Sequence, residues 1–345
     1  MTEIKKESKY KPRIRYMTEK DFDKKFPDEK AAVDYFIKIR YGETVLCRHC
    51  KEPVKYRYKG QIKLFHCYRC HNSFSPFKDT IFGKTHIGLL TWFSAIRHMI
   101  NNRKGISSCT LERELGVSTV TAWRISQQIK LAMGNHDVPN FAGIIEMDET
   151  FIGGKPRGQN AWVKNDGTKV PRKYPKKNKR GLGTEKTPIA GMKERSTGKV
   201  YAKVMLNTEG EKLLTFDDLM ELLKKVITEN NIIMTDGYSS YESLYKLYEH
   251  YSVIHSKGEY VNYENPAIHT NGIENFWSIL KRGHYGTFHQ ISKKYLQRYV
   301  DEFTFRQSTY KDLSTFDIVL KQCILHNPKI ITDTILNIKK PEGKE

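Results

Sequence analysis

Three acidic residues stand at positions from which carboxylates could bind divalent metal ions. Asp148 and Asp236 each close a short apolar run that is typical of a buried strand, and Glu274 lies in an amphipathic helix. A fold that pairs the two strands and packs the helix beside them would bring the three side chains together. Carboxylates are the ligands that Mg²⁺ and Mn²⁺ prefer, and two such ions about 3.5–4 Å apart can cleave phosphodiester bonds. We therefore expect a metal-dependent site that acts on nucleic acid.

The strand residues leave alternatives open. Strand alternation places Glu146 on the same face as Asp148 and Glu149 on the opposite face, so Glu146 could be a metal ligand or could support one. Asp236 is followed by Gly237 and could simply begin a turn. The spacing of these residues does not by itself establish a metal site.

The segment 270–282 predicts a helix with two distinct faces. Its apolar stripe consists of Ile273, Phe276, Trp277 and Leu280, and its polar stripe of Asn271, Glu274, Ser278 and Lys281. Lys281, with Arg282 beside it, could bind a phosphate near the metals. The alternative is an ordinary solvated face that happens to carry a glutamate and a lysine.

Four cysteines have the spacing of a structural zinc ribbon. Two Cys-x2-Cys pairs are separated by sixteen residues, and the segments 54–58 and 62–67 between them alternate across Lys59-Gly60 as a β-hairpin would. The predicted Zn²⁺ ligands are Cys47, Cys50, Cys67 and Cys70. We expect the two remaining cysteines, Cys109 and Cys323, to be buried apolar residues and no disulfide to form.

A helix-turn-helix pattern follows the ribbon. One predicted helix ends at Leu115 before Gly116, and Ser118 can cap a second helix that continues to about Met133. The second helix would present Thr119, Thr121, Arg124 and Gln128 to a DNA groove, while Val120, Trp123 and Ile125 would partly face inward. A purely structural pair of helices gives the same pattern, so that alternative stays open.

Charge is high and unevenly distributed. The chain has 59 Lys and Arg against 39 Asp and Glu, a net charge of +20, which indicates a polyanionic partner. Ten Lys and Arg stand against one acid, Asp166, between residues 155 and 180. This basic insertion is expected to order only on DNA, with Lys173, Lys176 and Lys177 on phosphates and Trp162 and Tyr174 stacking on bases. A bland solvated insertion is the alternative.

The order of elements predicts an α/β fold. We expect a ribonuclease-H-like mixed five-stranded sheet with helices, preceded by a zinc ribbon and a helix-turn-helix. In such a sheet the first and fourth strands are neighbours. The strands are predicted over 143–151, 188–194, 199–206, 232–235 and 252–255, and further helices over 28–42, 89–101, 212–229, 240–248 and 292–306.

Five regions follow from this pattern. They are an N-terminal tail and helix over 1–45, the zinc ribbon over 46–76, the helix-turn-helix region over 77–138, the catalytic domain over 139–310 with its basic insertion over 153–186, and a C-terminal helical tail over 311–345. No apolar run is long enough to span a bilayer, and no hydrophobic signal segment is present. These features predict a soluble protein of the cytoplasm, associated with the nucleoid.

Several linked motifs resemble those of the ISXO-type insertion-sequence transposases, relatives of the Merlin elements. The motifs are the two cysteine pairs, the helix pair, Glu-Met-Asp-Glu-Thr-Phe-Ile-Gly-Gly-Lys, Thr-Asp-Gly-Tyr, His-Thr-Asn-Gly-Ile-Glu-Asn-Phe-Trp-Ser-Ile-Leu-Lys-Arg-Gly and Gln-Arg-Tyr-Val-Asp-Glu-Phe-Thr-Phe-Arg. The resemblance covers about residues 30 to 310. It implies a DDE-type transposase that cuts and joins double-stranded DNA with Mg²⁺ or Mn²⁺, acting as a homodimer or higher oligomer on element ends and target.

The resemblance also suggests roles for individual residues. It places the first two catalytic acids on Asp148 and Asp236 and the third on Glu274, with Asn271 as the alternative. Lys281 follows Glu274 at the spacing seen in DDE enzymes. Two further functions stay open: a non-catalytic DNA-binding regulator derived from a transposase, and a nuclease or resolvase of the same fold.

Overall fold

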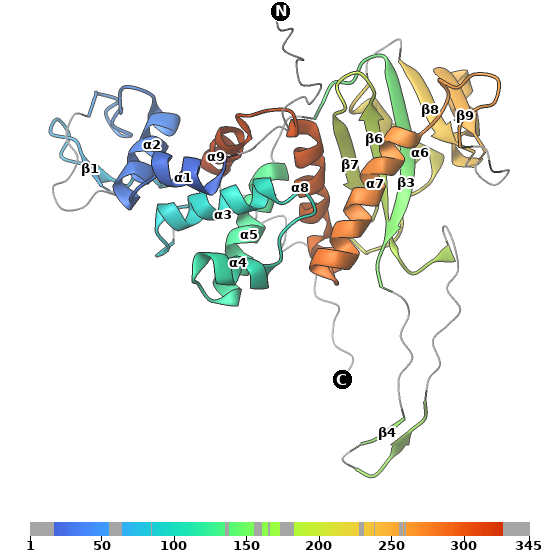
Figure 1. The fold of residues 1–345 in the computed structure, drawn as a ribbon, viewed down its shortest axis with the longest axis horizontal. Coiled ribbons are helices and arrows are strands. Elements are labelled where there is room, and N and C mark those ends of the chain that lie inside the picture. The colour runs from blue at the N-terminus through green and yellow to red at the C-terminus, as the bar shows by residue number, and fades with distance from the viewer. Residues whose placement is uncertain are drawn as a thin grey trace, which may run out of the picture. The chain divides into compact units, whose positions relative to one another are not determined.

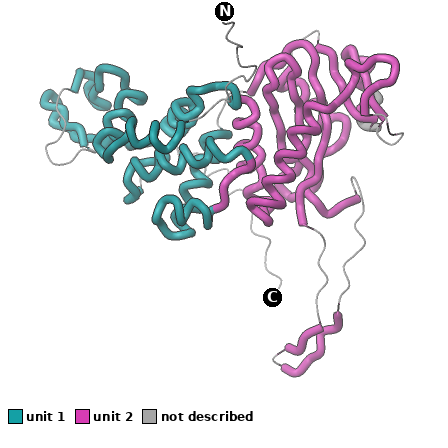
Figure 2. The backbone as a smooth tube through the Cα atoms, in the orientation of Figure 1, with its two compact units in different colours: residues 1–103, 108–135, 309–331 teal, residues 104–107, 136–308, 332–345 magenta. Residues whose placement is uncertain are grey.

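The protein divides into two compact units, which Figure 2 distinguishes by colour. The computed structural model describes residues 17–54, 64–83, 85–134, 138–154, 161–164, 166–172, 183–227, 231–237, 239–254, 258 and 260–326. Residues 1–103, 108–135 and 309–331 group into the first unit, and residues 104–107, 136–308 and 332–345 into the second. None of the helices among the described residues combines the length and apolar character that a bilayer crossing requires.

The first unit begins with two capped helices, α1 (Glu19–Lys25) and α2 (Glu29–Tyr41). Thr18 and Asp21 form a capping box at the start of α1, and the Asp28 carboxylate accepts the Ala31 N–H at the start of α2. The sequence predicted α2 but left residues 1–27 as a polar tail. That expectation is wrong for α1, whose Phe22 is buried in the unit.

The ribbon contains one short antiparallel pairing, between β1 (Phe65–His66) and β2 (Ser73–Phe74). The turn of the hairpin predicted over 54–67 and most of its strands lie outside the described residues. The pairing that is described flanks the second cysteine pair, because β1 precedes Cys67 and β2 follows Cys70.

Helices α3 (Leu89–Asn101), α4 (Ser108–Leu115), α5 (Thr119–Gly134) and α9 (Thr315–Leu325) complete the first unit. The Glu29 carboxylate caps α3 by accepting the N–H groups of Leu89 and Leu90 at 2.7 and 2.9 Å. Phe26, Phe93 and Phe316 pack together, with ring centroids 5.0–5.7 Å apart. Helix α9, far along the chain, therefore supplies part of the core of this unit.

The second unit is built on a five-stranded sheet in the order β7-β6-β3-β8-β9 (Figure 1). The strands are β3 (Ile144–Ile152), β6 (Thr187–Glu194), β7 (Val200–Val204), β8 (Ile232–Asp236) and β9 (Glu249–Val253). The first three strands pair antiparallel, whereas β8 runs parallel to β3 and β9 parallel to β8. This is the predicted ribonuclease-H-like arrangement. Only β9 departs clearly from its expected position, by about three residues at its start.

Helices cover both faces of the sheet. One face packs against α6 (Phe216–Lys224) and the 3-10 helix η2 (Ser239–Lys246), and the other against α7 (Asn271–Gly283) and α8 (Leu296–Thr309). Helix α6 is shorter than the predicted 212–229, and α8 begins after a 3-10 turn, η5 (Lys293–Tyr295). The π-helix η4 (His284–Phe288) continues α7. This three-layer packing buries both faces of β6, whereas the edge strand β9 keeps three exposed residues.

Helix α8 also protects the edge strand β7. Gln297 Oε1 accepts the Val204 N–H at 2.8 Å, and Ser308 Oγ accepts the Val200 N–H at 3.2 Å. Side chains of a helix thus bind edge N–H groups that another strand could otherwise pair with.

The basic insertion was expected to lack structure of its own in the free protein. Its described part instead contains a small hairpin, β4 (Trp162–Val163) paired with β5 (Lys169–Val170). Trp162 is about half exposed there, at 48%. Lys173, Tyr174, Lys176 and Lys177 lie outside the described residues.

Candidate active site and zinc centre

Three carboxylates meet where β3 and β8 lie side by side. These strands pair in parallel from Ile144 and Ile232 to Glu146 and Met234, so the residues that follow emerge at the same end. Oxygens of Asp148, Glu149 and Asp236 lie within 4.8 Å of one another there. The approach of Asp148 and Asp236 agrees with the predicted topology.

Glu149 was expected on the opposite face of the strand, with Glu146 beside Asp148. The structure keeps Glu146 and Glu149 on opposite faces of β3, since Glu146 contacts α7 and Glu149 contacts η2. Glu149 nevertheless brings an oxygen within 4.8 Å of those of Asp148 and Asp236, whereas Glu146 is not part of that group. The hydroxyl of Tyr241, from η2, donates a hydrogen bond to Glu149 Oε1.

Negative charge is crowded at this point. Burial, with the nearby carboxylates of Asp236 and Glu274, raises the pKa of Asp148 from 3.8 to about 7, although Lys281 acts in the opposite direction. Burial, Asp148 and Asp236 likewise raise the pKa of Glu149 well above its ordinary value. A divalent cation would relieve this repulsion, and the all-oxygen donor set fits Mg²⁺ or Mn²⁺.

Helix α7 brings Glu274 to the same pocket. Its apolar stripe is buried as predicted, and Trp277 lies over Gly191, where an added Cβ would come within 2.5 Å of the indole ring. Gly191 is the register partner of Asp148, so the helix lies against the sheet beside the acidic group. Glu274 lines a pocket of about 830 Å³ together with Asp148 and Glu149.

Glu274 and Asn271 differ in where they lie. The Thr270 hydroxyl donates to Glu274 Oε1 at 2.9 Å, on the side of α7 that faces the pocket. Asn271 is exposed at the first position of the helix and is not among the described residues that line the pocket. The geometry therefore favours Glu274 over Asn271 as the third acid.

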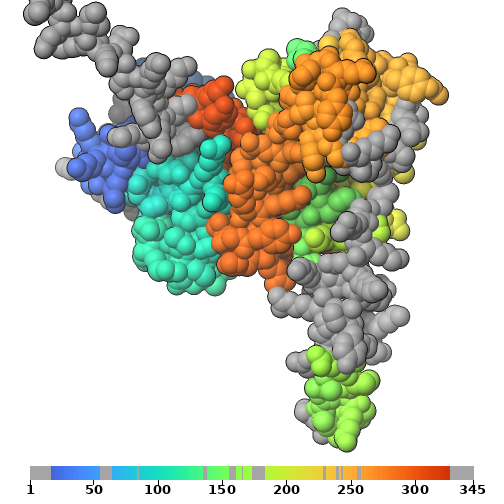
Figure 3. Space-filling model, turned by 45° about the vertical axis from the view of Figure 1, so that its right-hand side comes forward, coloured from blue at the N-terminus to red at the C-terminus, as the bar shows by residue number. Residues whose placement is uncertain are grey.

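Basic residues also line the wall of the pocket. Lys281 and Arg282 line it, and burial lowers the pKa of Lys281. Lys104 and the half-exposed Tyr285 line it as well. Helix α7 and η4, which carry most of this wall, contribute the orange surface at the centre of Figure 3. A pocket lined by both carboxylates and cations suits a phosphodiester bound to metal.

The four predicted zinc ligands gather in the ribbon. Their sulfur atoms lie within 4.8 Å of one another, and Cys47 and Cys70, like Cys50 and Cys67, have sulfurs 3.6 Å apart. Tetrahedral Zn²⁺ with Zn–S bonds of about 2.3 Å requires sulfur separations of about 3.8 Å. The cysteines therefore fit a structural zinc ion.

Backbone groups of the ribbon are arranged to stabilise thiolates. N–H groups of Cys50 and His49 lower the pKa of Cys47, and the Asn72 N–H lowers that of Cys70 to about 6. Although the Glu52 N–H acts to lower it, burial and the neighbouring sulfurs raise the pKa of Cys50 to about 12. A divalent cation would remove this last effect by compensating the charge of the four sulfurs.

The helix pair α4 and α5 exposes only part of the predicted recognition surface. Thr119 and Arg124 are exposed, whereas Thr121 and Gln128 are half-buried. Val120 was expected to face partly inward. That expectation is wrong, because Val120 is 59% exposed. Of the two single cysteines, Cys323 is buried as expected, but Cys109 is exposed on α4.

Comparison with known proteins identifies the family. Residues 140–308 match the ISXO2-like transposase domain, and residues 27–73 match the transposase zinc-ribbon domain. Together the two segments span more than half of the chain. The chain belongs to the family of ISXO2-like transposases, and the resemblance seen in its motifs is confirmed.

Two kinds of relative are similar to this chain. A protein of Halobacterium salinarum, described as an uncharacterized protein in transposable element ISH50, is 27% identical over 300 residues, which is 84% of this chain and 94% of that protein. Among solved structures, a pre-cleavage Mos1 transpososome has a TM-score of 0.26 and 10% identity, covering 67% of this chain and 77% of that one. The Mos1 strand transfer complex has a TM-score of 0.27 and 12% identity, covering 72% and 79%. Scores this low carry no argument about function.

Proposed function

We propose that the protein is a DNA transposase that binds the terminal inverted repeats of its own insertion sequence and cuts and joins DNA by a two-metal DDE mechanism. The observation that carries this proposal is the meeting of Asp148 and Asp236 at the ends of neighbouring strands, with Glu274 lining a pocket beside Asp148. Membership in a transposase family supports the same conclusion.

Each residue of the pocket has a distinct role in this proposal. Asp148, Asp236 and Glu274 hold two divalent ions, and Glu149 supports them from the same group of carboxylates. When bound, Mg²⁺ would activate water or a 3′-hydroxyl for in-line attack and stabilise the leaving oxygen. Lys281 binds a neighbouring phosphate, so that the DNA strand lies across the carboxylates.

Recognition of DNA is assigned to separate elements. Helix α5 would enter a groove with Thr119, Thr121, Arg124 and Gln128, and the zinc ribbon would bind beside it. Arg282 and the insertion residues Lys173, Lys176 and Lys177 would add phosphate contacts. The protein would act as a homodimer or higher oligomer, since two element ends must be brought together.

The two alternative functions are less well supported. A regulator that only binds DNA gains nothing from buried carboxylates, because their charge repels phosphates. A nuclease or resolvase would need the same pocket, and it differs from a transposase only in that it does not join strands.

The proposal is tested with labelled element ends, Mg²⁺ and purified protein. We expect Asp148→Ala and Asp236→Ala each to keep binding the ends and to lose both cleavage and joining by at least about 1000-fold, since several kcal/mol of metal-derived stabilisation disappear. Glu209→Ala, at an exposed turn of the same unit, is the matched control and should retain full activity. Wild-type activity in Asp148→Ala would overturn the proposal. If the wild-type protein cleaves the ends but does not join them, the protein is a nuclease and not a transposase.

A further inference from the structure

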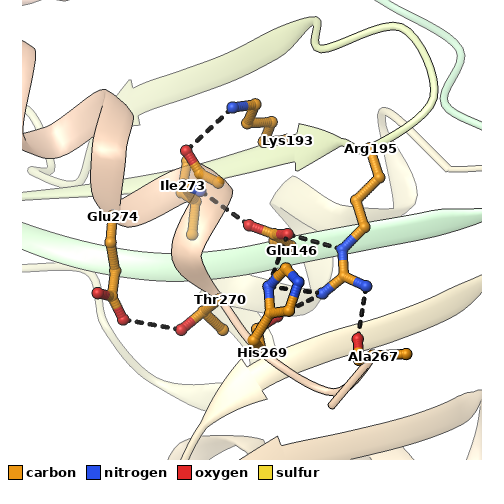
Figure 4. A network of polar contacts seen from close by, with 9 residues as sticks. Glu146, Lys193, Arg195, Ala267, His269, Thr270, Ile273 and Glu274 are labelled. Atoms are coloured by element: carbon orange, nitrogen blue, oxygen red, sulfur yellow. Dashed lines mark hydrogen bonds and ion pairs between the residues drawn. The ribbon is translucent and has the colours of Figure 1, made fainter. Parts of the chain in front are cut away.

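A buried carboxylate links the strand that carries Asp148 to the helix that carries Glu274 (Figure 4). Glu146 lies two residues before Asp148 on β3 and is only 1% exposed. Its Oε2 accepts the Ile273 N–H at 2.8 Å, in the first turn of α7. The residue after Ile273 is Glu274, so one side chain connects the two elements beside both proposed metal ligands.

Arg195, at the end of β6, completes the connection. Its Nε donates to Glu146 Oε1 at 2.7 Å, and its two terminal nitrogens donate to the carbonyl oxygens of Ala267 and His269 at 2.6 Å each. The His269 Nδ1 atom lies 3.0 Å from the guanidinium and 3.5 Å from Glu146 Oε1, so this ring belongs to the same network. Arg195 thus fixes the chain that leads into α7.

The packing at Gly272 depends on the absence of a side chain. An added Cβ would lie 2.6 Å from Glu146 Oε2, closer than non-bonded atoms approach. Lys193 Nζ donates to the Gly272 carbonyl oxygen at 3.1 Å from the other side. The first turn of α7 is therefore held by charged side chains from both β3 and β6.

Electrostatics favour this arrangement. The carboxylate of Glu146 sits at the N-terminus of a 13-residue helix, where free N–H groups and the helix dipole stabilise negative charge. Its second oxygen is paired with a guanidinium, so the buried charge is satisfied. Removing the charge would leave Arg195 without its anionic partner and would weaken the hydrogen bond to the first turn of α7.

We propose that Glu146, clamped by Arg195, is a positioning residue that places Glu274 for metal binding. This inference rests on the proposed function, because it assigns Glu274 to the metal site. Glu146 itself does not touch the metal. Glu146 holds the start of α7 close to β3, so the carboxylate of Glu274 keeps its place in the pocket.

The test is a double-mutant cycle on Mn²⁺ affinity, measured by electron paramagnetic resonance on zinc-loaded protein without DNA. We expect Glu146→Gln to weaken Mn²⁺ binding about tenfold in the wild-type background and to have no further effect in Glu274→Ala. Arg195→Lys should weaken it in the same direction, because an ammonium cannot hold Glu146 and both carbonyls at once.

Glu194→Gln is the matched control. Glu194 is a buried carboxylate at the last position of β6, where it accepts the Ala142 N–H at 2.7 Å and the Thr197 hydroxyl. It should lower the melting temperature without changing Mn²⁺ affinity, which separates loss of stability from loss of positioning. If Glu146→Gln fails to fold, the Arg195→Lys cycle gives the same answer.

Two results overturn the inference. One is an unchanged Mn²⁺ affinity in both Glu146→Gln and Arg195→Lys, and the other is an equal loss in the presence and absence of Glu274. The Mn²⁺ affinity of Asp148→Ala distinguishes failure of this inference from failure of the proposed function. If Asp148→Ala binds Mn²⁺ as wild type does, the metal site itself is refuted, whereas if it loses Mn²⁺ binding, only the role of Glu146 falls.

Discussion

Individual carboxylates in the pocket lie close to one another and partly away from water. Such groups share protons when no cation is present, because each ionised neighbour makes the next ionisation harder. Asp148, whose pKa is raised to about 7, is the clearest case. The repulsion between these carboxylates favours binding of a divalent ion. The same repulsion lowers the stability of the folded protein when no ion is bound.

This loss of stability predicts a pH-dependent effect of Asp148→Asn on the melting temperature. Between about pH 4 and 7 folded Asp148 keeps a proton that the unfolded chain has released, so the stability of wild type falls as pH rises through that window. Asparagine cannot ionise. The variant should therefore be more stable than wild type at pH 8, by up to about 4 kcal/mol, and should melt at the same temperature as wild type near pH 4.

Thermal denaturation without added divalent ions measures the difference. Addition of Mg²⁺ should remove it by stabilising wild type alone. Glu209→Gln, which changes an exposed carboxylate of the same unit, should show no such pH dependence. An equal melting temperature of Asp148→Asn and wild type at pH 8 would contradict the explanation.

Some residues of the pocket were predictable and others were not. Asp148 and Asp236 end apolar runs, and Glu274 lies on one stripe of a clearly amphipathic helix, so local pattern indicated all three. Glu149 was missed because alternation places it on the other face of β3 from Asp148, and its side chain reaches the carboxylate group from there. Lys104 was missed because no local pattern marks a lysine in a connection between helices, and only the tertiary fold brings it to the pocket.

At the scale of elements, periodicity predicted what depends on local packing. Helix α3 was predicted with its observed ends, and β3, β6, β8 and α7 within one residue at most boundaries. Helix α1 and the true start of β9 were not predicted. Helix α1 has only seven residues and one buried side chain, so it carries little periodic signal. The exposed, polar first residues of β9 are paired through backbone groups, which a hydrophobic pattern does not reveal.

Helix α5 supports a prediction about sequence specificity. Arg124 is exposed on this helix, and an arginine in a groove can bind a guanine with two hydrogen bonds. We expect Arg124→Ala to reduce the preference for element ends over unrelated DNA by about tenfold or more. Competition binding at constant salt measures this ratio.

Lys321→Ala is the control for this change. It removes an exposed cation from α9 of the same unit and should weaken binding to both DNAs equally or not at all. A uniform loss of affinity in Arg124→Ala would show that this residue binds phosphate and not a base. In that case α5 would not be the element that reads sequence.

At the scale of the whole molecule, charge and division into units dominate. The net charge of +20 favours DNA of any sequence, and half of the excess cations fall in one insertion whose described part forms an isolated hairpin. A two-stranded hairpin is marginally stable in water by itself. Its positive charge therefore points to stabilisation by a partner that carries phosphates.

Deletion of residues 158–179 tests this view. The deleted stretch contains seven Lys and Arg, and each phosphate contact that is lost should reduce the slope of log affinity against log salt by about one. We expect the slope to fall by several, with the pattern of preferred ends retained. An unchanged slope would mean that the insertion does not contact DNA.

Helix α9 has a consequence for biosynthesis. Phe26 and Phe93 are made early, but their neighbour Phe316 leaves the ribosome only after the whole sheet of the second unit has been translated. Until then the amino-terminal helices lack part of their hydrophobic core. Domains generally fold as units, so the second unit, whose sheet is already translated, can fold first. A translation product that ends before α9 would therefore contain a finished sheet beside an unfinished helical unit.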